Sequence, residues 1–334
     1  AEPDLVAQAT RVRIESAGKT VELARAADGR WTLAGTPVLP ADVSRLNRLA
    51  TDLVTPKIER HVTSNAARIA TLDLDSSALT LLDSAGKTLL ALDLGKTADG
   101  GGRFLRYGDE AKAYLARLNL SLDADPASWR DTTLVSGLKA EDIASVSIGF
   151  PDTPAPVVVS RTAADAPWTS PATPAGSQVK TSVLTSQLGN LSALRFTEVK
   201  PNLDPEVVAA RIFPREITLT TFAGRTMKFA LNRAPEPPAP PAPEVKEGET
   251  PPPTPPAAPR PVYVEITDSQ TDAVLSEAGK THAFEIGEWI LTALPAKAAD
   301  LFEPVPTPPA ASAEPVSATT EPISVTTEPM TATP

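Results

Sequence analysis

The sequence predicts an α+β protein of two tandem repeats, each a mostly antiparallel β-sheet with one principal α-helix, plus a disordered proline-rich loop and a disordered tail. Three observations predict this. The same order of strand-like and helix-like segments occurs twice, each half contains one clear helical pattern, and two segments dominated by proline interrupt or follow the patterned sequence. The chain has 334 residues and is 41% hydrophobic, which is enough for two ordinary domains.

Composition excludes several classes of protein. The formal net charge is -10, so the chain lacks the basic surface that contacts with a phosphate backbone require, and we expect no nucleic-acid partner. It has no cysteine, which excludes disulfides, thiolate nucleophiles and cysteine-ligated metals. Its apolar runs are shorter than the roughly 20 residues that a membrane-spanning helix needs. Because the sequence begins with Ala1 rather than methionine, we expect that a leader, anchor or tag has been removed.

The first half opens with strands and a helix. Strand-like segments at 12–14 and 20–25 precede Trp31, which opens a further strand. Apolar residues then recur at steps of three and four, which predicts a helix, and Pro40 suits its start. The residues of this pattern are Val43, Leu46, Leu49, Ala50 and Leu53. A strand candidate at 57–60 follows the helix.

The first half continues with a β-hairpin. Residues 78–83 and 88–92 alternate as strands and are separated by a turn at Gly86. The chain then passes through the loop 98–102, which contains three consecutive glycines, into the strand candidate 103–107.

The second half repeats this order with different residues. The corresponding segments are a strand at 143–148, a strand at 157–161, Trp168, a helix whose pattern includes Val179, Val183, Leu184, Leu188 and Leu191 with Ser177 as N-cap, a strand at 194–199, a hairpin formed by 216–222 and 226–231, and a strand at 262–266.

Proline dominates the segment between the last two of these strands. In the alignment of the halves, residues 234–261 occupy the place of the glycine loop 98–102. This segment is therefore interpreted as an enlarged loop within the second repeat, not as a domain boundary. The expected organisation is a first repeat at 1–137, a second repeat at 138–301 with the insertion 234–261, and a disordered tail rich in proline, threonine, alanine and glutamate at 302–334.

Small motifs in this order resemble a bacterial domain-of-unknown-function family. They are Gly29-Arg30-Trp31, Leu72-Asp73-Leu74-Asp75 before a hairpin, Leu94-Gly95, Arg103-Phe104-Leu105-Arg106-Tyr107 and Trp129-Arg130-Asp131. The resemblance covers most of residues 10–295 and is strongest from 12 to 148. It implies an envelope protein with one N-terminal membrane anchor, encoded beside gliding-motility-type ABC transporter genes. The family contributes no catalytic residues that could be transferred to this chain.

The search for catalytic or ligand-binding chemistry yields no site. His61 and His282 are far apart in sequence and have no cysteine to complete a metal site, so both are interpreted as surface or packing residues. Asp73 and Asp75 lack the other ligands of a calcium loop and are expected in a solvated turn. Gly100 to Gly102 lack the lysine of a phosphate-binding loop. The prediction is therefore no catalytic residue, no cofactor-binding residue, no metal ligand and no cofactor.

The four tryptophans stand at what the alignment treats as two repeated positions. Trp31 pairs with Trp168, and Trp129 pairs with Trp289. Because duplication tends to preserve core packing, all four are expected in the core. The alternative is that an exposed tryptophan stacks on a sugar ring or anchors a partner protein.

The functional expectation combines these points. The chain is expected to be a non-enzymatic periplasmic protein, or one on the extracytoplasmic face of the inner membrane, that serves as accessory or scaffold subunit of a gliding-type ABC transporter system. Its expected partners are the membrane transporter or other envelope proteins, with membrane attachment through the N-terminal anchor that the resemblance implies. The alternative is a carbohydrate- or peptidoglycan-binding module that holds a glycan in a cleft between the repeats.

Overall fold

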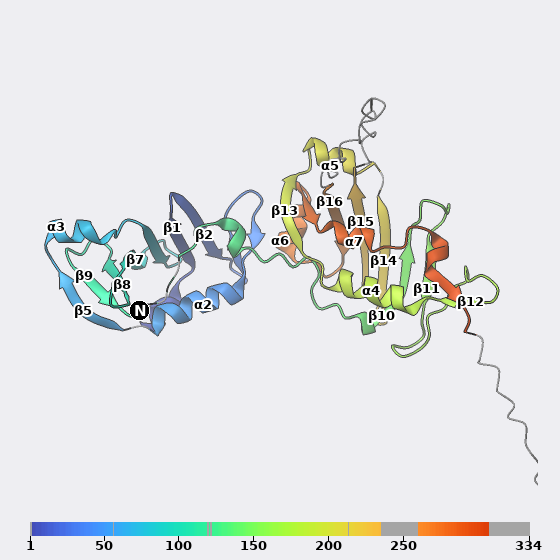
Figure 1. The fold of residues 1–334 in the computed structure, drawn as a ribbon, viewed down its shortest axis with the longest axis horizontal. Helices are drawn as coiled ribbons and strands as arrows, with labels where there is room; N and C mark the ends of the chain where they lie inside the picture. The colour runs from blue at the N-terminus through green and yellow to red at the C-terminus, as the bar shows by residue number, and fades with distance from the viewer. Residues whose placement is uncertain are drawn as a thin grey trace, which may run out of the picture.

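The computed structural model describes residues 2–306 except 56, 119, 121, 213 and 235–259. Two lobes follow one another along the long axis, and the longest helices, α2 and α4, lie on the same lower side in Figure 1. The protein is α+β with mostly antiparallel sheets and few helices, as the sequence predicts. The expected disordered tail at 302–334 is wrong at its start, because Phe302–Pro304 form the strand β18 and pair with residues 177–179. The tail from 307 onward, and residues 235–259 of the expected loop 234–261, lie outside this described part.

The first lobe contains a nine-stranded sheet in the order β4-β3-β2-β1-β6-β7-β8-β9-β5. Its elements are α1 (Pro3–Gln8), β1 (Arg11–Ser16), β2 (Lys19–Arg25), β3 (Trp31–Leu33), β4 (Leu39–Pro40), α2 (Val43–Val54), β5 (Ile58–Thr63), α3 (Ala66–Ile69), η1 (Ala70–Leu72), β6 (Ser77–Leu82), β7 (Thr88–Thr97), β8 (Arg103–Tyr107), β9 (Ala113–Ala116) and η2 (Pro126–Trp129).

The second lobe contains a seven-stranded sheet in the order β11-β10-β14-β15-β16-β17-β13 and a two-stranded sheet, β12-β18. Its elements are η3 (Ala140–Asp142), β10 (Ile143–Ile148), β11 (Val157–Ser160), β12 (Ser177–Val179), α4 (Thr181–Ser192), β13 (Phe196–Pro201), α5 (Pro205–Ala210), β14 (Arg215–Thr221), β15 (Thr226–Arg233), β16 (Val262–Asp268), α6 (Ala273–Gly279), β17 (His282–Ile286), α7 (Glu288–Thr292), η4 (Ala298–Leu301) and β18 (Phe302–Pro304).

The two large sheets can be matched strand by strand in sequence order. The run β2-β1-β6-β7-β8-β9-β5 of the first sheet then reads β11-β10-β14-β15-β16-β17-β13 in the second. In both sheets the strand after the principal helix, β5 or β13, crosses to the far edge and pairs with the strand that comes last in the sheet, β9 or β17. Alternate residues of the central strands, such as Ile14 and Ile148, are fully buried beneath the principal helix of their lobe.

The principal helices begin at different residues from those the sequence suggests. The N-cap of α2 is Asp42, whose side chain accepts a hydrogen bond from the Arg45 amide, whereas Pro40 belongs to β4. The N-cap of α4 is Lys180, and the expectation that Ser177 caps this helix is wrong. Ser177 pairs with Pro304 in the β12-β18 sheet, so its backbone is extended.

The strands that flank the proline-rich segment pair directly. Arg233 at the end of β15 lies opposite Val262 at the start of β16. In the first lobe, β7 and β8 pair in the same way across the loop 98–102, where Ala98 donates its amide hydrogen to the Gly102 carbonyl oxygen at 3.0 Å. Both connections therefore join neighbouring antiparallel strands.

The expectation that all four tryptophans are core residues is correct for two of them. Trp129 and Trp168 are buried and Trp31 is half-buried, but Trp289 is 58% exposed. The backbone hydrogen bonds of Trp129 also differ from those of Trp289. The Trp129 carbonyl accepts from the amide of the α2 N-cap at 2.8 Å, and Leu301 does the same for the α4 N-cap at 2.8 Å. The buried Leu301 thus accepts the same kind of backbone bond in the second lobe as Trp129 does in the first, and Trp289 lies on α7 outside the core.

The two lobes contact each other through the segment that follows η2. Thr132 accepts a hydrogen bond from the Phe196 amide at 3.0 Å, and the Leu134 amide donates to the Leu194 carbonyl at 2.9 Å. At the other side of the junction, Arg30 forms an ion pair with Asp272 at 2.7 Å. No helix in the described part of the chain is long and apolar enough to cross a membrane.

Candidate functional site

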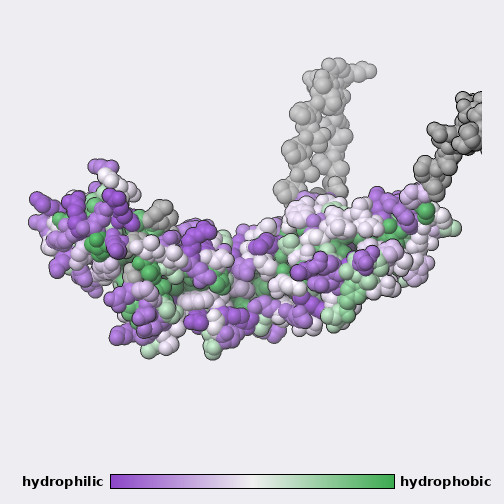
Figure 2. All heavy atoms as spheres, turned by 90° about the horizontal axis from the view of Figure 1, so that it is seen from below, coloured by the Kyte–Doolittle hydropathy of each residue, from purple (hydrophilic) through white to green (hydrophobic). Residues whose placement is uncertain are grey.

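An apolar groove opens on the first lobe between α1, α2 and the sheet. We call it the Trp31 groove; Val6 of α1, Ala50 and Leu53 of α2, Leu81 of β6 and Trp31 of β3 are among the residues that line it. Its volume is about 560 Å³. Figure 2 shows green, hydrophobic atoms among the purple ones on the underside of this lobe, where α2 lies. Apolar side chains such as Val6 and Ala50 are partly exposed in the groove, whereas most apolar side chains of the sheet in this lobe are buried.

Local sequence explains why the groove stays open. Leu46, Leu49 and Leu53 of α2 pack into the core, but the small side chain of Ala50 leaves space beside them. The facing wall is α1, which has six residues and no side-chain N-cap, and only its Val6 packs against the core. A helix this short is held mainly by its tertiary contacts, so this wall is the weaker of the two.

The second lobe closes the corresponding position. Thr32 lies opposite Ala24, and Thr169 lies opposite Ser160, so the residues before them, Trp31 and Trp168, correspond. Each tryptophan has an arginine at the end of the neighbouring strand. The guanidinium carbon of Arg161 lies 4.6 Å from the centroid of the Trp168 ring. In the first lobe, Arg25 instead donates through Nε to the Gly29 carbonyl oxygen at 3.3 Å.

Hydrogen bonds fix Arg161 over its ring. Its Nε donates to the Ile143 carbonyl at 2.8 Å, and its Nη2 donates to the Ala140 carbonyl at 2.7 Å. These acceptors lie on η3 and at the start of β10, the segments that correspond in chain order to α1 and β1. The arginine therefore ties the lobe's first turn to its tryptophan, and Trp168 is only 7% exposed.

The groove suits binding of apolar surface rather than proton transfer. Among its described lining residues, Arg25 is the one ionisable side chain, and arginine does not deprotonate in proteins. Asn47 and Thr51 form a polar rim on the exposed side of α2. An aliphatic floor with a tryptophan edge and a thin polar rim is the composition of a groove that accepts the apolar face of a helix.

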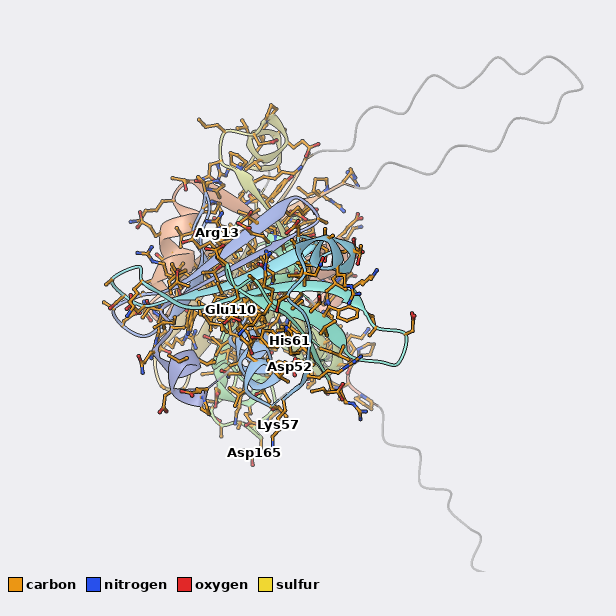
Figure 3. The ribbon with its side chains drawn as sticks, turned by 90° about the vertical axis from the view of Figure 1, so that its left-hand side faces the viewer. Arg13, Asp52, Lys57, His61, Glu110 and Asp165 are labelled. Carbon is orange, nitrogen blue, oxygen red and sulfur yellow. The ribbon has the colours of Figure 1, made fainter. Side chains whose placement is uncertain are left out.

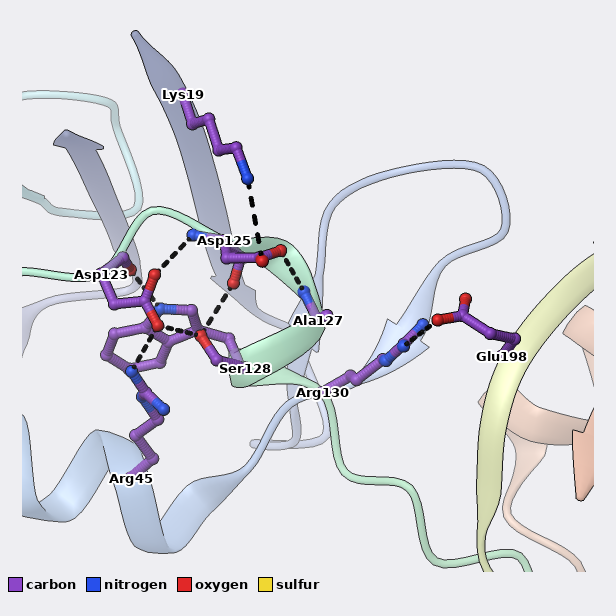
Figure 4. A network of polar contacts seen from close by, with 9 residues as sticks. Lys19, Arg45, Asp123, Asp125, Ala127, Ser128, Arg130 and Glu198 are labelled. Carbon is purple, nitrogen blue, oxygen red and sulfur yellow. Dashed lines mark hydrogen bonds and ion pairs between the residues drawn. The ribbon is translucent and has the colours of Figure 1, made fainter. Parts of the chain in front are cut away.

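A polar network ties α2 to the segment that leads into the second lobe (Figure 4). Asp123 accepts hydrogen bonds from Ser128 Oγ at 2.6 Å and from Arg45 Nη2 at 3.1 Å. The hydrogen bond from Ser128, with those from the Asp125 amide and Arg45, lowers the pKa of the Asp123 carboxyl. The Trp129 indole donates to the Asp123 carbonyl at 2.6 Å.

The next residue carries the network across the junction. Arg130 donates to the Thr197 carbonyl at 2.9 Å and lies 3.5 Å from the Glu198 carboxylate (Figure 4). The wall of the Trp31 groove is therefore mechanically connected to β13 of the second lobe.

The two histidines do not come together. His61 lies on β5, the edge strand at the end of the first lobe that faces the viewer in Figure 3, with Nε2 3.0 Å from Ser64 Oγ. His282 begins β17 in the second lobe, with Nδ1 2.8 Å from Thr281 Oγ1. Within the described residues, no group of three or more histidine, aspartate and glutamate side chains could hold a metal ion.

The other residues singled out in the sequence lie in turns. Asp73 follows η1 in the left-handed conformation with φ 54°, and the Asp75 side chain is 99% exposed. Gly101 and Gly102 have positive φ in the connection between β7 and β8. Of the two Asn-x-Ser sequences, the one at Asn119 lies outside the described residues, and Asn190 lies on α4.

The arginines beside the tryptophans were missed in the sequence. Arg25 precedes Trp31, and Arg161 precedes Trp168, each at the end of the strand that leads into the turn. Aligning the halves on their tryptophans would have shown an arginine in both, but not which of them closes over its ring. Arg161 covers its ring because it bonds to backbone carbonyl groups of η3, and the position of a backbone carbonyl cannot be read from residue types.

The protein is thus α+β, with an apolar groove on its first lobe. A family described as "Domain of unknown function (DUF4340)" matches residues 31–210, more than half of the 334-residue chain, and the chain belongs to this family. The match begins at Trp31, includes α2, and continues through the junction to the end of α5. No curated protein and no solved structure matches the chain.

Proposed function

We propose that this chain is a non-enzymatic envelope protein that acts as accessory or scaffold subunit of a gliding-type ABC transporter system. In this proposal it works in the periplasm or on the extracytoplasmic face of the inner membrane, anchored in the full-length protein. Membership of the family supports the proposal through the resemblance described above. The acidic composition and the junction between two lobes are consistent with a rigid spacer that positions other subunits.

The Trp31 groove is the observation that carries the proposal. It presents aliphatic side chains and the edge of a half-buried tryptophan to solvent, although the equivalent tryptophan of the second lobe is covered. Aromatic residues at a desolvated centre commonly provide most of the energy of a protein interface. We assign the groove to the apolar face of an amphipathic helix from a transporter subunit.

The proposed organisation is two tandem repeats, 1–137 and 138–301, with an insertion at 234–261. The matching strand order of the two sheets supports it, as does the shared bond from a 3₁₀-helix carbonyl to the N-cap amide of each principal helix. In this view the second repeat provides a closed, stable platform and the first provides the binding surface.

The test is a pair of variants on the exposed side of α2. Asn47→Glu/Thr51→Glu places two carboxylates on the rim of the groove, and Ser44→Glu places one elsewhere on the same helix. The protein, purified from native membranes after crosslinking, is expected to bring down the transporter subunits in its wild-type and Ser44→Glu forms. The double variant is expected to lose them. Equal recovery with all three proteins, or no transporter subunit with any of them, would reject the proposal.

The glycan-binding alternative has one observation in its favour. Trp289 is 58% exposed on α7, and an exposed indole can stack on a sugar ring. If this alternative holds, Trp289→Ala keeps the thermal midpoint of the wild type and loses affinity for peptidoglycan fragments. Unchanged affinity in the variant, measured by calorimetry, would exclude Trp289 as the sugar contact, and absence of binding to the wild-type protein would reject the alternative.

A further inference from the structure

A second hollow, the Arg215 cavity, lies in the other lobe and is independent of the Trp31 groove. It is bounded by Phe150 after β10, by the start of β14, by the end of β15 and by the segment that follows α7. Its volume is about 910 Å³. Phe150, Leu231, Leu291 and Leu294 contribute an apolar wall.

Arg215 carries a charge into this cavity without an acidic partner. Its Nη2 donates to the Pro295 carbonyl oxygen at 2.7 Å, and its guanidinium lies 5.0 Å from the centroid of the Phe150 ring. Its Nε is buried and has no hydrogen-bond partner in the described part of the chain. Burial lowers the pKa of Arg215, and the carboxylate of Asp152 only partly opposes this effect.

The other charged groups at the cavity are already engaged or face away. Arg233 forms an ion pair with Glu288 at 3.0 Å, and Asp152 lies 3.4 Å from the Ala298 amide nitrogen. Arg260 also lines the cavity, and its side chain is not free, because it already interacts with another group of the protein. Glu216 also lines the cavity, but it follows Arg215 on β14, so strand alternation places its side chain on the opposite face of the sheet from that of Arg215.

We propose that the Arg215 cavity binds an amphiphilic anion, that is, a carboxylate or phosphate group on an apolar chain. The anionic group pairs with the guanidinium of Arg215, and the chain lies along the apolar lining residues that remain accessible, Ile212, which is 64% exposed, and the half-buried Leu291. A carboxylate or phosphate is the planar or multidentate acceptor that a guanidinium binds best.

The energetics favour this class of ligand over others. A partly desolvated cation that meets only a carbonyl oxygen and an aromatic face is incompletely compensated. The guanidinium is desolvated already in the folded protein, so an incoming anion gains a charge-assisted hydrogen bond against the cost of its own desolvation alone. A free anion would leave the apolar wall exposed to water, whereas an uncharged amphiphile would leave the charge unpaired. A ligand with both parts satisfies both surfaces.

The experiment is calorimetric titration with dodecanoate and with dodecyl phosphate, below their micelle concentrations. Inorganic phosphate and uncharged dodecyl maltoside serve as the partial ligands. Arg215→Gln removes the charge, and Thr292→Glu adds a negative charge at the exposed rim of the cavity without disturbing the core. Arg195→Gln makes the same change of charge in the same lobe outside the cavity and is the matched control.

Saturable binding of one equivalent of at least one anionic amphiphile is expected, and its preference between carboxylate and phosphate identifies the head group. Arg215→Gln should weaken it about tenfold or more, because a hydrogen bond to a charged group contributes that much. Thr292→Glu should weaken it measurably, because its carboxylate repels the anionic head group. Arg195→Gln should leave it unchanged. If Arg215→Gln does not fold, Thr292→Glu decides. Absence of saturable binding, equal affinity of wild type and Thr292→Glu, or equally tight binding of dodecyl maltoside would overturn the proposal.

Discussion

Trp31 and Trp168 occupy the same strand register in the two lobes, but one lines an open groove and the other is covered. In both lobes an arginine lies at the end of the preceding strand or next to it: Arg25 ends β2, and Arg161 directly follows β11. Arg161 reaches the carbonyl groups of η3 and covers its tryptophan, whereas Arg25 bonds to the turn at Gly29 and leaves Trp31 half-exposed. The two tryptophans thus have similar backbone surroundings, and the conformation of the neighbouring arginine distinguishes a covered ring from one that lines an open groove.

The segment before the first strand of each lobe explains this choice. η3 runs directly into β10, so the Ala140 and Ile143 carbonyls lie within reach of Arg161. In the first lobe, Ala9 separates α1 from Thr10 and β1, and the Ala9 amide donates back to the Val6 carbonyl. The two segments therefore differ in their spacing from the first strand, because Ala9 and Thr10 separate α1 from β1, whereas no residue separates η3 from β10.

The strongest test of the comparison replaces each tryptophan in turn. Trp168→Ala removes a buried ring and leaves a cavity, which should lower the free energy of unfolding by about 3–5 kcal/mol. Trp31→Ala removes a ring that already faces solvent on one side, so we expect a loss of about 1–2 kcal/mol. Urea denaturation followed by circular dichroism measures both. Equal losses would mean that the two positions are equally packed and that the comparison fails.

Like the two tryptophans, the ion pairs of the two lobes differ in how exposed their side chains are. Arg225 and Asp268 in the second lobe are separated by 2.6 Å and their side chains are 8% and 5% exposed, while Arg45 and Asp123 in the first are 34% and 42% exposed. Asp268→Asn strands a buried cation and should cost about 3 kcal/mol. Asp123→Asn should cost about 1 kcal/mol.

The pH dependence of stability follows from Asp268. Burial alone would raise the pKa of its carboxyl, but the bonds from Arg225 and the Gln270 amide lower it below the ordinary value of 3.8. A carboxyl whose pKa is depressed by folding stabilises the protein above its unfolded pKa and loses this contribution as pH falls through the folded value. We expect the free energy of unfolding from this pair to be constant above about pH 5 and to fall below about pH 4. Asp268→Asn should flatten that acid limb. An identical acid limb in the variant would show that other carboxyls cause it.

The sequence predicted which segments form strands and helices. It was less informative on where each element begins and on which side chains remain exposed. The hairpin β6-β7, the strand β16 and both principal helices follow from alternation and from three- and four-residue spacing, since these patterns report which face is buried. The start of α4 did not follow, because Ser177 pairs with Pro304, a residue 127 positions away in the numbering. Trp289 was misplaced for a similar reason: Leu301 caps α4 through its backbone, and a backbone carbonyl has no sequence signal. The groove is open because Arg25 bonds to the Gly29 carbonyl, and the position of that acceptor depends on the folded backbone.

A smaller effect should distinguish the two arginines. Arg161→Gln removes a cation that lies 4.6 Å from the Trp168 centroid and weakens its bonds to η3, so we expect a loss of about 1–2 kcal/mol and stronger quenching of Trp168 fluorescence by iodide. Arg25→Gln changes an exposed side chain and should alter stability by less than about 0.5 kcal/mol. The quenching measurement is made in variants that keep Trp168 as the sole tryptophan. Unchanged quenching after Arg161→Gln would show that Arg161 does not protect the ring.

The smallest expected change converts the open site into the closed one. Ala50 lies eight positions after the N-cap of α2, and Leu188 lies eight positions after the N-cap of α4, where it is buried. Ala50→Leu should fill part of the Trp31 groove and raise the free energy of unfolding by about 0.5–1 kcal/mol, as other cavity-filling changes do. It should also shield Trp31 from iodide and weaken recovery of the transporter subunits. Leu188→Ala, the reverse change, should destabilise the second lobe without affecting that recovery. A stabilised Ala50→Leu protein that still recovers its partners in full would place the binding surface outside the groove, and a destabilised one would show that the groove is already filled.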